Sequence, residues 1–260
     1  AGEHGTFQIC CGADNVKAGG KFPLALIGAP VYATAKDHVT IEGVMEIKQG
    51  KLRGYDSYGM LCSGVELGLN EDLYPGAGYN GLLVLPEDAK VGADVKPILG
   101  LDDWIFDIAI TSNRPDCQCI YGMAREVAAV LGKELKEPAI DYTADDVKKE
   151  NFKVSVLAQD ICPRYTAHYV HDVKISESPA WMRKRLALVG IGSISNVVDI
   201  TNFILKELGQ PMHAFDYSNL EGDEIVVRRA NDGEKIVTLD EKEFELNSNN
   251  LVICDGKKPV

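Results

Sequence analysis

The most informative stretch of this sequence reads Asn196-Val-Val-Asp-Ile-Thr-Asn-Phe-Ile-Leu-Lys-Glu-Leu-Gly-Gln-Pro-Met-His-Ala-Phe-Asp216. Apolar residues crowd its first part, which predicts a helix from about residue 196 to residue 208 that ends at Gly209. A Gly-Gln-Pro turn follows, and His213 stands directly after it. The stretch therefore predicts a helix whose end leads into a rigid turn and a histidine.

Polar side chains in an apolar helix must find hydrogen-bond partners or line a wet cleft. Thr201 and Asn202 are such side chains, and His213 leaves two readings open. It is either a structural histidine bonded to backbone or a pocket group that positions a water or a carbonyl for ester hydrolysis. No Ser-His-Asp or Cys-His signature accompanies it, so we expect no covalent nucleophile. An acidic dyad of Asp199 and Asp216 is a weaker alternative, because these carboxylates also suit caps of the helix and the turn.

The sequence around this stretch predicts both strands and helices. A shorter helix has Ser178 as its expected N-cap, Pro179 at its first position and Gly190 as its terminator. Strand patterns come before and after the two helices, at 152–157, 166–170, 224–228, 235–239 and 251–254. The second half of the chain therefore predicts an α+β domain with segregated elements.

The first half begins with short apolar runs broken by glycines, such as 22–27, 44–47 and 82–85, which predict a small β-barrel up to about residue 98. A helix is then expected to start at Asn113-Arg-Pro-Asp116 and to stop at Gly132, with Ile120, Met123, Val127 and Leu131 on one buried face. The polar run 141–151 is the best domain boundary.

Composition limits the function further. Lys and Arg number 27 against 39 Asp and Glu, so the net charge of −12 has the wrong sign for gripping phosphate through the overall field. The seven cysteines are scattered, which predicts free thiols and no zinc or other metal site. No apolar run is long enough to span a membrane. We expect a soluble, cytoplasmic protein without a membrane or DNA partner.

The quoted stretch resembles the hallmark of the B3/B4 domain of bacterial-type phenylalanyl-tRNA synthetase β subunits, NVVDxTNxxxxELGQPxHAFD. Other segments resemble that family in the same order. Those similar to its tRNA-binding OB domain are Lys51-Leu-Arg-Gly54, Gly59-Met-Leu-Cys-Ser63 and Glu66-Leu-Gly-Leu69, those similar to its connector are Ile110-Thr-Ser-Asn-Arg-Pro-Asp116 and Ala124-Arg-Glu-Val-Ala128, and Cys162-Pro-Arg-Tyr-Thr166 is similar to the start of its B3/B4 domain.

The resemblance implies an α+β multidomain chain. Residues 1–98 would form an incomplete OB-type β-barrel that lacks its first strand, residues 99–148 a helical connector, and residues 149–260 a B3/B4-type α+β editing domain truncated at its C-terminal end. On the family pattern, the acidic group that reads the tyrosine hydroxyl would follow residue 260. One departure is Gly190-Ile-Gly-Ser-Ile194, where many members have Gly-Ile-Arg-Pro-Ile, so a contact of that arginine with the tRNA end is in doubt.

The resemblance also implies the function of a phenylalanine–tRNA ligase β subunit. Its partners would be the α subunit, in a heterotetramer of two α and two β subunits, and tRNA(Phe). ATP and Mg²⁺ would serve the holoenzyme, and no cofactor is expected in this fragment. Carried over by position, the catalytic residues of tyrosyl-tRNA(Phe) editing are His213, Thr201 and Asn202, with Pro211 and Gly209 in contact with the substrate. The alternative is a noncatalytic tRNA- or protein-interaction scaffold, and we expect the isolated fragment to be inactive.

Overall fold

The computed structural model describes residues 2–37, 40–71, 74, 81–143 and 152–260. The chain divides into two compact units, each made of two separate stretches of sequence. Unit 1 comprises Ala1–Glu134 and Ile175–Met212, and unit 2 comprises Leu135–Lys174 and His213–Val260. The domain boundary expected near residue 98 stays a prediction. The one expected at residue 148 lies outside the described residues.

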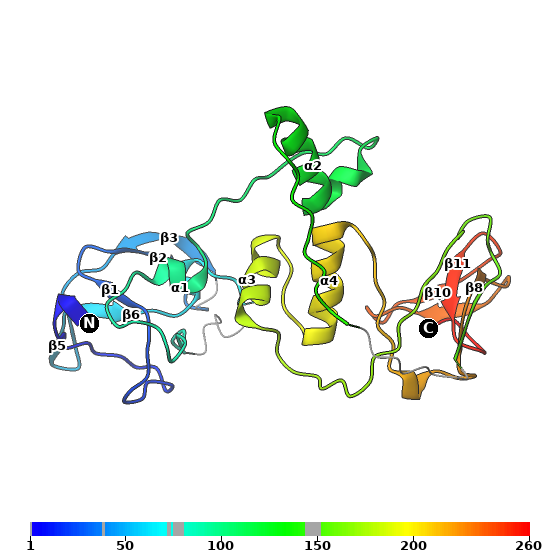
Figure 1. The fold of residues 1–260 in the computed structure, drawn as a ribbon. Coiled ribbons are helices and arrows are strands. Elements are labelled where there is room, and N and C mark those ends of the chain that lie inside the picture. The colour runs from blue at the N-terminus through cyan, green and yellow to red at the C-terminus, as the bar shows by residue number, and fades with distance from the viewer. Residues whose placement is uncertain (1, 38–39, 72–73, 75–80, 144–151) are drawn as a thin grey trace. The chain divides into compact units, whose positions relative to one another are not determined.

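The first part of unit 1 holds short strands that pair two by two (Figure 1). They are β1 (Leu24–Leu26), β2 (Pro30–Thr34), β3 (Ile41–Glu46), β4 (Gly50–Leu52), β5 (Tyr55–Ser57) and β6 (Gly59–Leu61). The antiparallel pairs are β1 with β6, β2 with β3, and β4 with β5. Among the described residues up to 98 these pairs close no barrel. A mixed α+β fold with small sheets is thus confirmed, and the OB-type barrel stays a prediction.

A small apolar core holds the strands of this part together. Ala25, Val31, Ile47 and Cys62 form a buried cluster. Burial raises the pKa of the Cys62 thiol to about 11, and the nearby charge of Glu66 adds to the effect. All seven cysteines are free thiols, as predicted.

The strand predicted at 82–85 does not form, although this segment is tied into the same region. The backbone N–H of Leu83 donates to the carbonyl of Cys62, and that of Leu85 donates to the carbonyl of Lys21. Leu82 and Leu83 are buried. Isolated hydrogen bonds to two different segments satisfy the backbone here without a continuous ladder.

Unit 1 also contains helices. They are η1 (Gly2–His4), η2 (Val65–Leu67), α1 (Val95–Leu99), η3 (Pro115–Gln118), α2 (Ile120–Leu131), α3 (Ala180–Leu188) and α4 (Asn196–Leu208). Helices α3 and α4 pack against each other, and α2 packs on α4 (Figure 1). In the described part of the chain, none of the helices has the length and apolarity that a bilayer crossing requires.

The helix predicted from Asn113 to Gly132 is interrupted. Cys119 is extended, with φ −127° and ψ 159°, and separates η3 from α2. The end at Gly132 is confirmed, because this residue has φ +60° and its N–H caps the helix. The buried face predicted for α2 is wrong: Ile120, Val127 and Leu131 are 59%, 48% and 63% exposed. Among the described residues the buried position of α2 is Gly122, near its start, so apolar spacing alone did not fix which part of the helix is covered.

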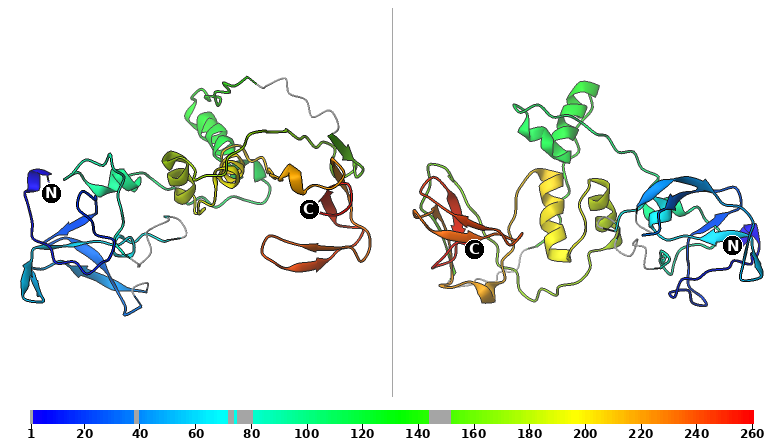
Figure 2. Two further views of the ribbon diagram at one scale, coloured as in Figure 1. Left: turned by 90° about the horizontal axis from the view of Figure 1, so that it is seen from below. Right: turned by 180° about the vertical axis from the view of Figure 1, so that it is seen from behind.

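Unit 2 is built on a three-stranded sheet in the order β11-β8-β7. β7 (Lys153–Val156) runs parallel to β8 (Glu224–Arg229), and β11 (Leu251–Cys254) runs antiparallel to β8. The remaining elements are the hairpin of β9 (Lys235–Val237) with β10 (Glu243–Glu245) and the short helix η4 (Tyr217–Asn219). Figure 2 shows the sheet and the hairpin from two further sides. The strand predicted at 166–170 is wrong, because these residues are irregular.

A largely enclosed ion pair joins β8 to the loop before β9. The Arg228 guanidinium donates to both carboxylate oxygens of Glu234, at 2.6 and 2.8 Å, and the two side chains are only 19% and 16% exposed. Glu234 also accepts a hydrogen bond from the backbone N–H of Asn231. Arg228 first, and then this N–H, lower the pKa of Glu234 to about 2.

Gly122 leaves no room for a side chain. A Cβ at this position would lie 1.7 Å from the carbonyl oxygen of Asp116 in η3. We expect Gly122→Ala to lower the free energy of unfolding by about 2 kcal/mol or more, since backbone would have to move. Denaturant unfolding measures the change. Gly12→Ala is the control, because a Cβ there meets nothing within 4 Å, and an equal effect of both substitutions would contradict the prediction.

The Arg228–Glu234 pair predicts a pH dependence. The folded-state pKa of Glu234 lies below its ordinary value of 4.5, so its stabilising effect is full above about pH 4.5 and is lost as the pH falls towards 2. Wild-type protein is expected to exceed Glu234→Gln in unfolding free energy by about 2 kcal/mol at pH 7, with the gap closing in acid. A gap that stays constant from pH 7 to pH 2 would contradict this assignment. Glu243→Gln, in an exposed ion pair with Lys235, is the control.

Candidate functional site

Helix α4 has the ends that its sequence predicts. Ser195 is the N-cap, and its side chain accepts a hydrogen bond from the N–H of Val198. Gly209 ends the helix in the left-handed conformation, with φ +76°, and its N–H donates to the carbonyl of Leu205 at 2.9 Å. The predicted helix at 196–208 and its stop at Gly209 are therefore confirmed.

Asp199, in the first turn of α4, is fully buried. One carboxylate oxygen accepts hydrogen bonds from the hydroxyls of Ser178 and Ser193, both at 2.5 Å, and the other accepts from the N–H of Ile194 at 2.9 Å. Burial raises the pKa of Asp199, but these bonds outweigh burial and leave the pKa below its ordinary value. The carboxylate is thus an ionised, enclosed hydrogen-bond acceptor.

This network corrects two expectations. Ser178 does not cap α3: the helix begins at Ala180 with Pro179 as its N-cap, and the Ser178 hydroxyl turns to the stronger anionic acceptor Asp199. Asp199 is too enclosed to act as half of a hydrolytic dyad on a substrate that arrives from solvent. Asp216 caps η4 by accepting the N–H of Ser218, as expected of a turn cap.

Two further contacts hold α4 beside α3. Asn196 and Ser176 are linked by hydrogen bonds in both directions, one of them from the Asn196 N–H to the Ser176 carbonyl at 2.9 Å. Trp181 of α3 meets Phe203 of α4 edge to face, with ring centroids 5.4 Å apart. Figures 1 and 2 show the two helices side by side from every direction drawn.

The predicted site residues Thr201 and Asn202 are partly exposed on α4. The Thr201 hydroxyl donates to the carbonyl of Val198 at 2.7 Å, which leaves its oxygen free to accept a hydrogen bond from a ligand. The Asn202 amide offers both a donor and an acceptor. These two side chains are therefore available for binding a polar group.

The turn after α4 is supported from α2. A Cβ at Gly209 would lie 3.2 Å from the sulfur of Cys119, the N-cap residue of α2, so the absence of a side chain at Gly209 permits this approach. Pro211 is exposed, and its carbonyl accepts a hydrogen bond from the side chain of Gln210. The start of α2 thus fixes the turn on which Pro211 stands.

His213 is exposed and belongs to unit 2, whereas Thr201, Asn202, Gly209 and Pro211 belong to unit 1. Its ring lies 6.2 Å from that of Phe215 and makes no hydrogen bond to the described residues of its own unit. A structural histidine bonded to nearby backbone therefore has no support within unit 2. That the five predicted residues form one pocket stays a prediction.

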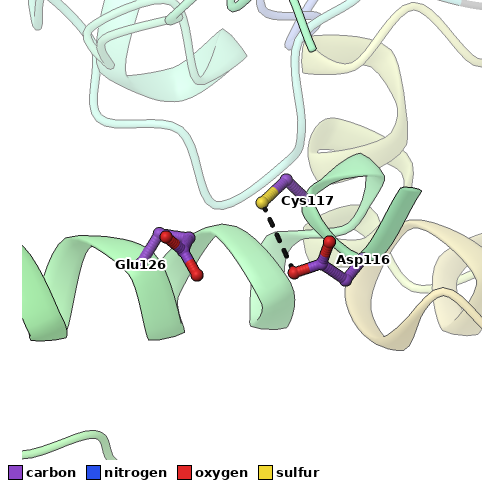
Figure 3. A group of neighbouring side chains, drawn as sticks. All are labelled: Asp116, Cys117 and Glu126. Atoms are coloured by element: carbon purple, nitrogen blue, oxygen red, sulfur yellow. Dashed lines mark hydrogen bonds between the residues drawn. The ribbon is translucent and has the colours of Figure 1, made fainter. Parts of the chain in front are cut away.

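Asp116, Cys117 and Glu126 lie close enough to hold a metal ion, as Figure 3 shows. The Arg114 guanidinium already binds both carboxylates, at 2.8 Å from Asp116 and 2.5 Å from Glu126. Hydrogen bonding to Arg114 lowers the pKa of Asp116 to about 2. With a cation in place between its acidic members, the group is suited to a salt bridge that joins η3 to α2 and poorly suited to a metal.

The basic triplet Arg183-Lys184-Arg185 does not form a single phosphate-binding face. Arg183 faces Glu177, with 3.6 Å between charged atoms, and Arg185 faces Asp103 at 4.0 Å. The Lys184 stem runs past Gly100, where an added Cβ would meet its Cδ at 3.0 Å. Successive residues on a helix point about 100° apart, so the three side chains diverge.

Comparison with known proteins places these residues in a family. Residues 161–260 match the B3/4 domain, a range that includes every predicted site residue. The chain is 50% identical over 257 residues to the phenylalanine–tRNA ligase β subunit of Syntrophus aciditrophicus, which covers 98% of this chain. It is 47% identical to that of Bacillus cereus over 100% of this chain. It is 43% identical to that of Clostridium acetobutylicum over 99% of this chain. The chain belongs to the phenylalanine–tRNA ligase β-subunit family.

The chain spans about a third of the length of these β subunits, 30% of the Syntrophus protein and 31% of the Bacillus protein. The segment that departs from the β-subunit family pattern, residues 190–194, contains Ser193, whose hydroxyl is one of the donors to Asp199. That contact was not foreseen, because no local pattern links a loop serine to an aspartate six residues later.

His213 is exposed and Asn202 is partly exposed, so we expect neither side chain to contribute much to the stability of the fold. We expect Asn202→Ala and His213→Ala each to change the free energy of unfolding by no more than about 0.5 kcal/mol. Denaturant unfolding of wild-type and variant proteins checks this. A loss of about 2 kcal/mol or more would show that the side chain is structural.

Proposed function

We propose that this chain is part of the β subunit of a cytoplasmic phenylalanine–tRNA ligase and that its B3/4 domain hydrolyses mischarged tyrosyl-tRNA(Phe). The observation that carries the proposal is the match of residues 161–260 to the B3/4 domain. Inside the matched range His213 is exposed, and Thr201 and Asn202 are partly exposed. In this proposal the β subunit assembles with an α subunit, as two α and two β subunits, and binds tRNA(Phe).

Editing answers a physical limit on selectivity. A pocket shaped for phenylalanine excludes tyrosine weakly, because tyrosine differs only by an added hydroxyl, so mischarged tRNA requires removal at a second site. Charging of tRNA would take place on the α subunit. There ATP would activate phenylalanine, and Mg²⁺ would neutralise the negative charge of the ATP phosphates. The Arg114 salt bridge argues against a metal at Asp116 and Glu126, whose carboxylates it already binds.

The proposed roles follow from side-chain chemistry. His213 takes a proton from a water whose oxygen attacks the ester carbonyl carbon, and it returns that proton to the ribose oxygen as the ester bond breaks. Thr201 and Asn202 hold the water and the carbonyl by hydrogen bonds, because both have polar atoms exposed on α4. Gly209 and Pro211 contact the substrate and shape the turn between these groups. No covalent intermediate is required.

The net charge of −12 limits the part that this chain takes in holding tRNA. Several of its arginines are paired with carboxylates, among them Arg114, Arg228 and Arg229. Most of the affinity for tRNA(Phe) is therefore assigned to the rest of the assembled ligase, and this chain supplies the hydrolytic groups.

The test uses the full-length β subunit assembled with its α subunit. Deacylation of tyrosyl-tRNA(Phe) is measured for wild-type enzyme and for His213→Ala, with phenylalanylation of tRNA(Phe) measured alongside. We expect His213→Ala to slow deacylation by about 100-fold, the usual contribution of a positioned acid–base group, with phenylalanylation unchanged. His168→Ala is the matched control, since His168 is an exposed histidine of the same unit outside the hallmark stretch.

The editing proposal is overturned if wild-type enzyme does not deacylate tyrosyl-tRNA(Phe). It is also overturned if His213→Ala deacylates at the wild-type rate. The B3/4 domain would then act as a noncatalytic scaffold in the ligase. A loss of phenylalanylation equal to the loss of deacylation would likewise count against a specific hydrolytic role.

A further inference from the structure

The Asp199 carboxylate joins three segments of unit 1 at one point. It lies on α4, and it accepts hydrogen bonds from Ser178, which precedes α3, and from Ser193 and Ile194 in the loop between the two helices. Ser178 is itself buried, so this partner of Asp199 is shielded from solvent together with the carboxylate. A buried anion with three donors keeps its geometry, because any displacement leaves charge or donors unsatisfied.

Thr201, one of the proposed site residues, lies on the side of α4 roughly opposite Asp199. Residues on a helix advance by about 100°, so Thr201 stands about 200° around the axis from Asp199 and Asn202 about 300° around it. Asp199 is fully buried, while Thr201 and Asn202 are partly exposed. Rotation or sliding of α4 at the Asp199 anchor therefore moves both polar side chains directly.

We propose that Asp199 is a positioning residue for ester hydrolysis: by binding Ser178, Ser193 and Ile194 it sets the rotation and height of α4, and so the placement of Thr201 and Asn202. This inference rests on the proposed editing function. Asp199 does not touch the substrate. Its effect is transmitted along the helix, where a displacement of about 1 Å is enough to reduce a positioned reaction about 100-fold.

Other contacts keep α4 folded and docked when the Asp199 anchor is weakened. The Ser195 cap, the bonds between Asn196 and Ser176, and the packing of Trp181 on Phe203 do not involve the carboxylate. Neutralising Asp199 therefore shifts the helix within a retained fold. This separates a positioning role from a purely structural one.

The experiment uses the assembled α and β subunits and measures kcat and KM for deacylation of tyrosyl-tRNA(Phe), together with phenylalanylation. Asp199→Asn preserves size but replaces an oxygen acceptor with a donor. We expect it to lower kcat of deacylation about 100-fold, with KM within about twofold of wild type and phenylalanylation unchanged. Asp94→Asn is the matched control, since Asp94 is an exposed cap of α1 at which asparagine serves equally well, and we expect it to deacylate like wild type.

Ser193 offers a milder test with a rescue. Ser193→Ala removes one donor to Asp199 and is expected to lower kcat of deacylation about tenfold. Ser193→Thr keeps the hydroxyl, and the position is only partly buried, so we expect near wild-type kcat. Rescue by threonine identifies the hydroxyl–carboxylate bond as the cause.

The inference is overturned if Asp199→Asn deacylates like wild type, if it loses phenylalanylation to the same extent as deacylation, or if Ser193→Thr is as impaired as Ser193→Ala. These outcomes are distinct from failure of the editing proposal. If the editing proposal itself failed, wild-type enzyme would not deacylate tyrosyl-tRNA(Phe), or His213→Ala would deacylate it at the wild-type rate.

Discussion

The arrangement of α3 and α4 in unit 1 depends on one buried negative charge. Asp199 is removed from water and yet ionised, which is sustainable only while the Ser178 and Ser193 hydroxyls and the Ile194 N–H surround it. Its position near the start of α4 adds the favourable field of the helix N-terminus. Because those donors come from both ends of α3 and its loop, satisfying one carboxylate aligns two helices.

A second layer of contacts extends this alignment to the turn after α4. Gly209 and Cys119 touch where the turn meets the start of α2, and Gly122 allows η3 to lie against the first turn of α2. Arg114 then ties Asp116 to Glu126 across the same junction. Small residues and one ion pair thus hold η3 against α2 and the start of α2 against the turn that follows α4.

The sequence predicted features that depend on neighbours in the chain. Apolar spacing and Gly209 are local signals and predict the extent of α4, whereas the Ser195 cap is seen only in the structure. Contacts between distant residues were not: Ser178 was assigned to α3 although it serves Asp199, and the covered part of α2 was misjudged because spacing does not say which neighbour packs where. Apolar runs predict short strands before residue 98 but do not specify how the strands pair, and the barrel expected of them stays a prediction. The editing residues themselves came from family resemblance, as no spacing rule singles out Thr201, Asn202 and His213.

The parallel pairing of β7 with β8 has a consequence for synthesis on the ribosome. Roughly 70 residues separate the two strands, including the whole of α3 and α4, which belong to the other unit. At translation rates of about 5 to 20 residues per second, β7 emerges several seconds before β8 exists to pair with it. The contacts between α3 and α4 do not depend on β8, whereas β7 has no parallel partner until β8 has been synthesised.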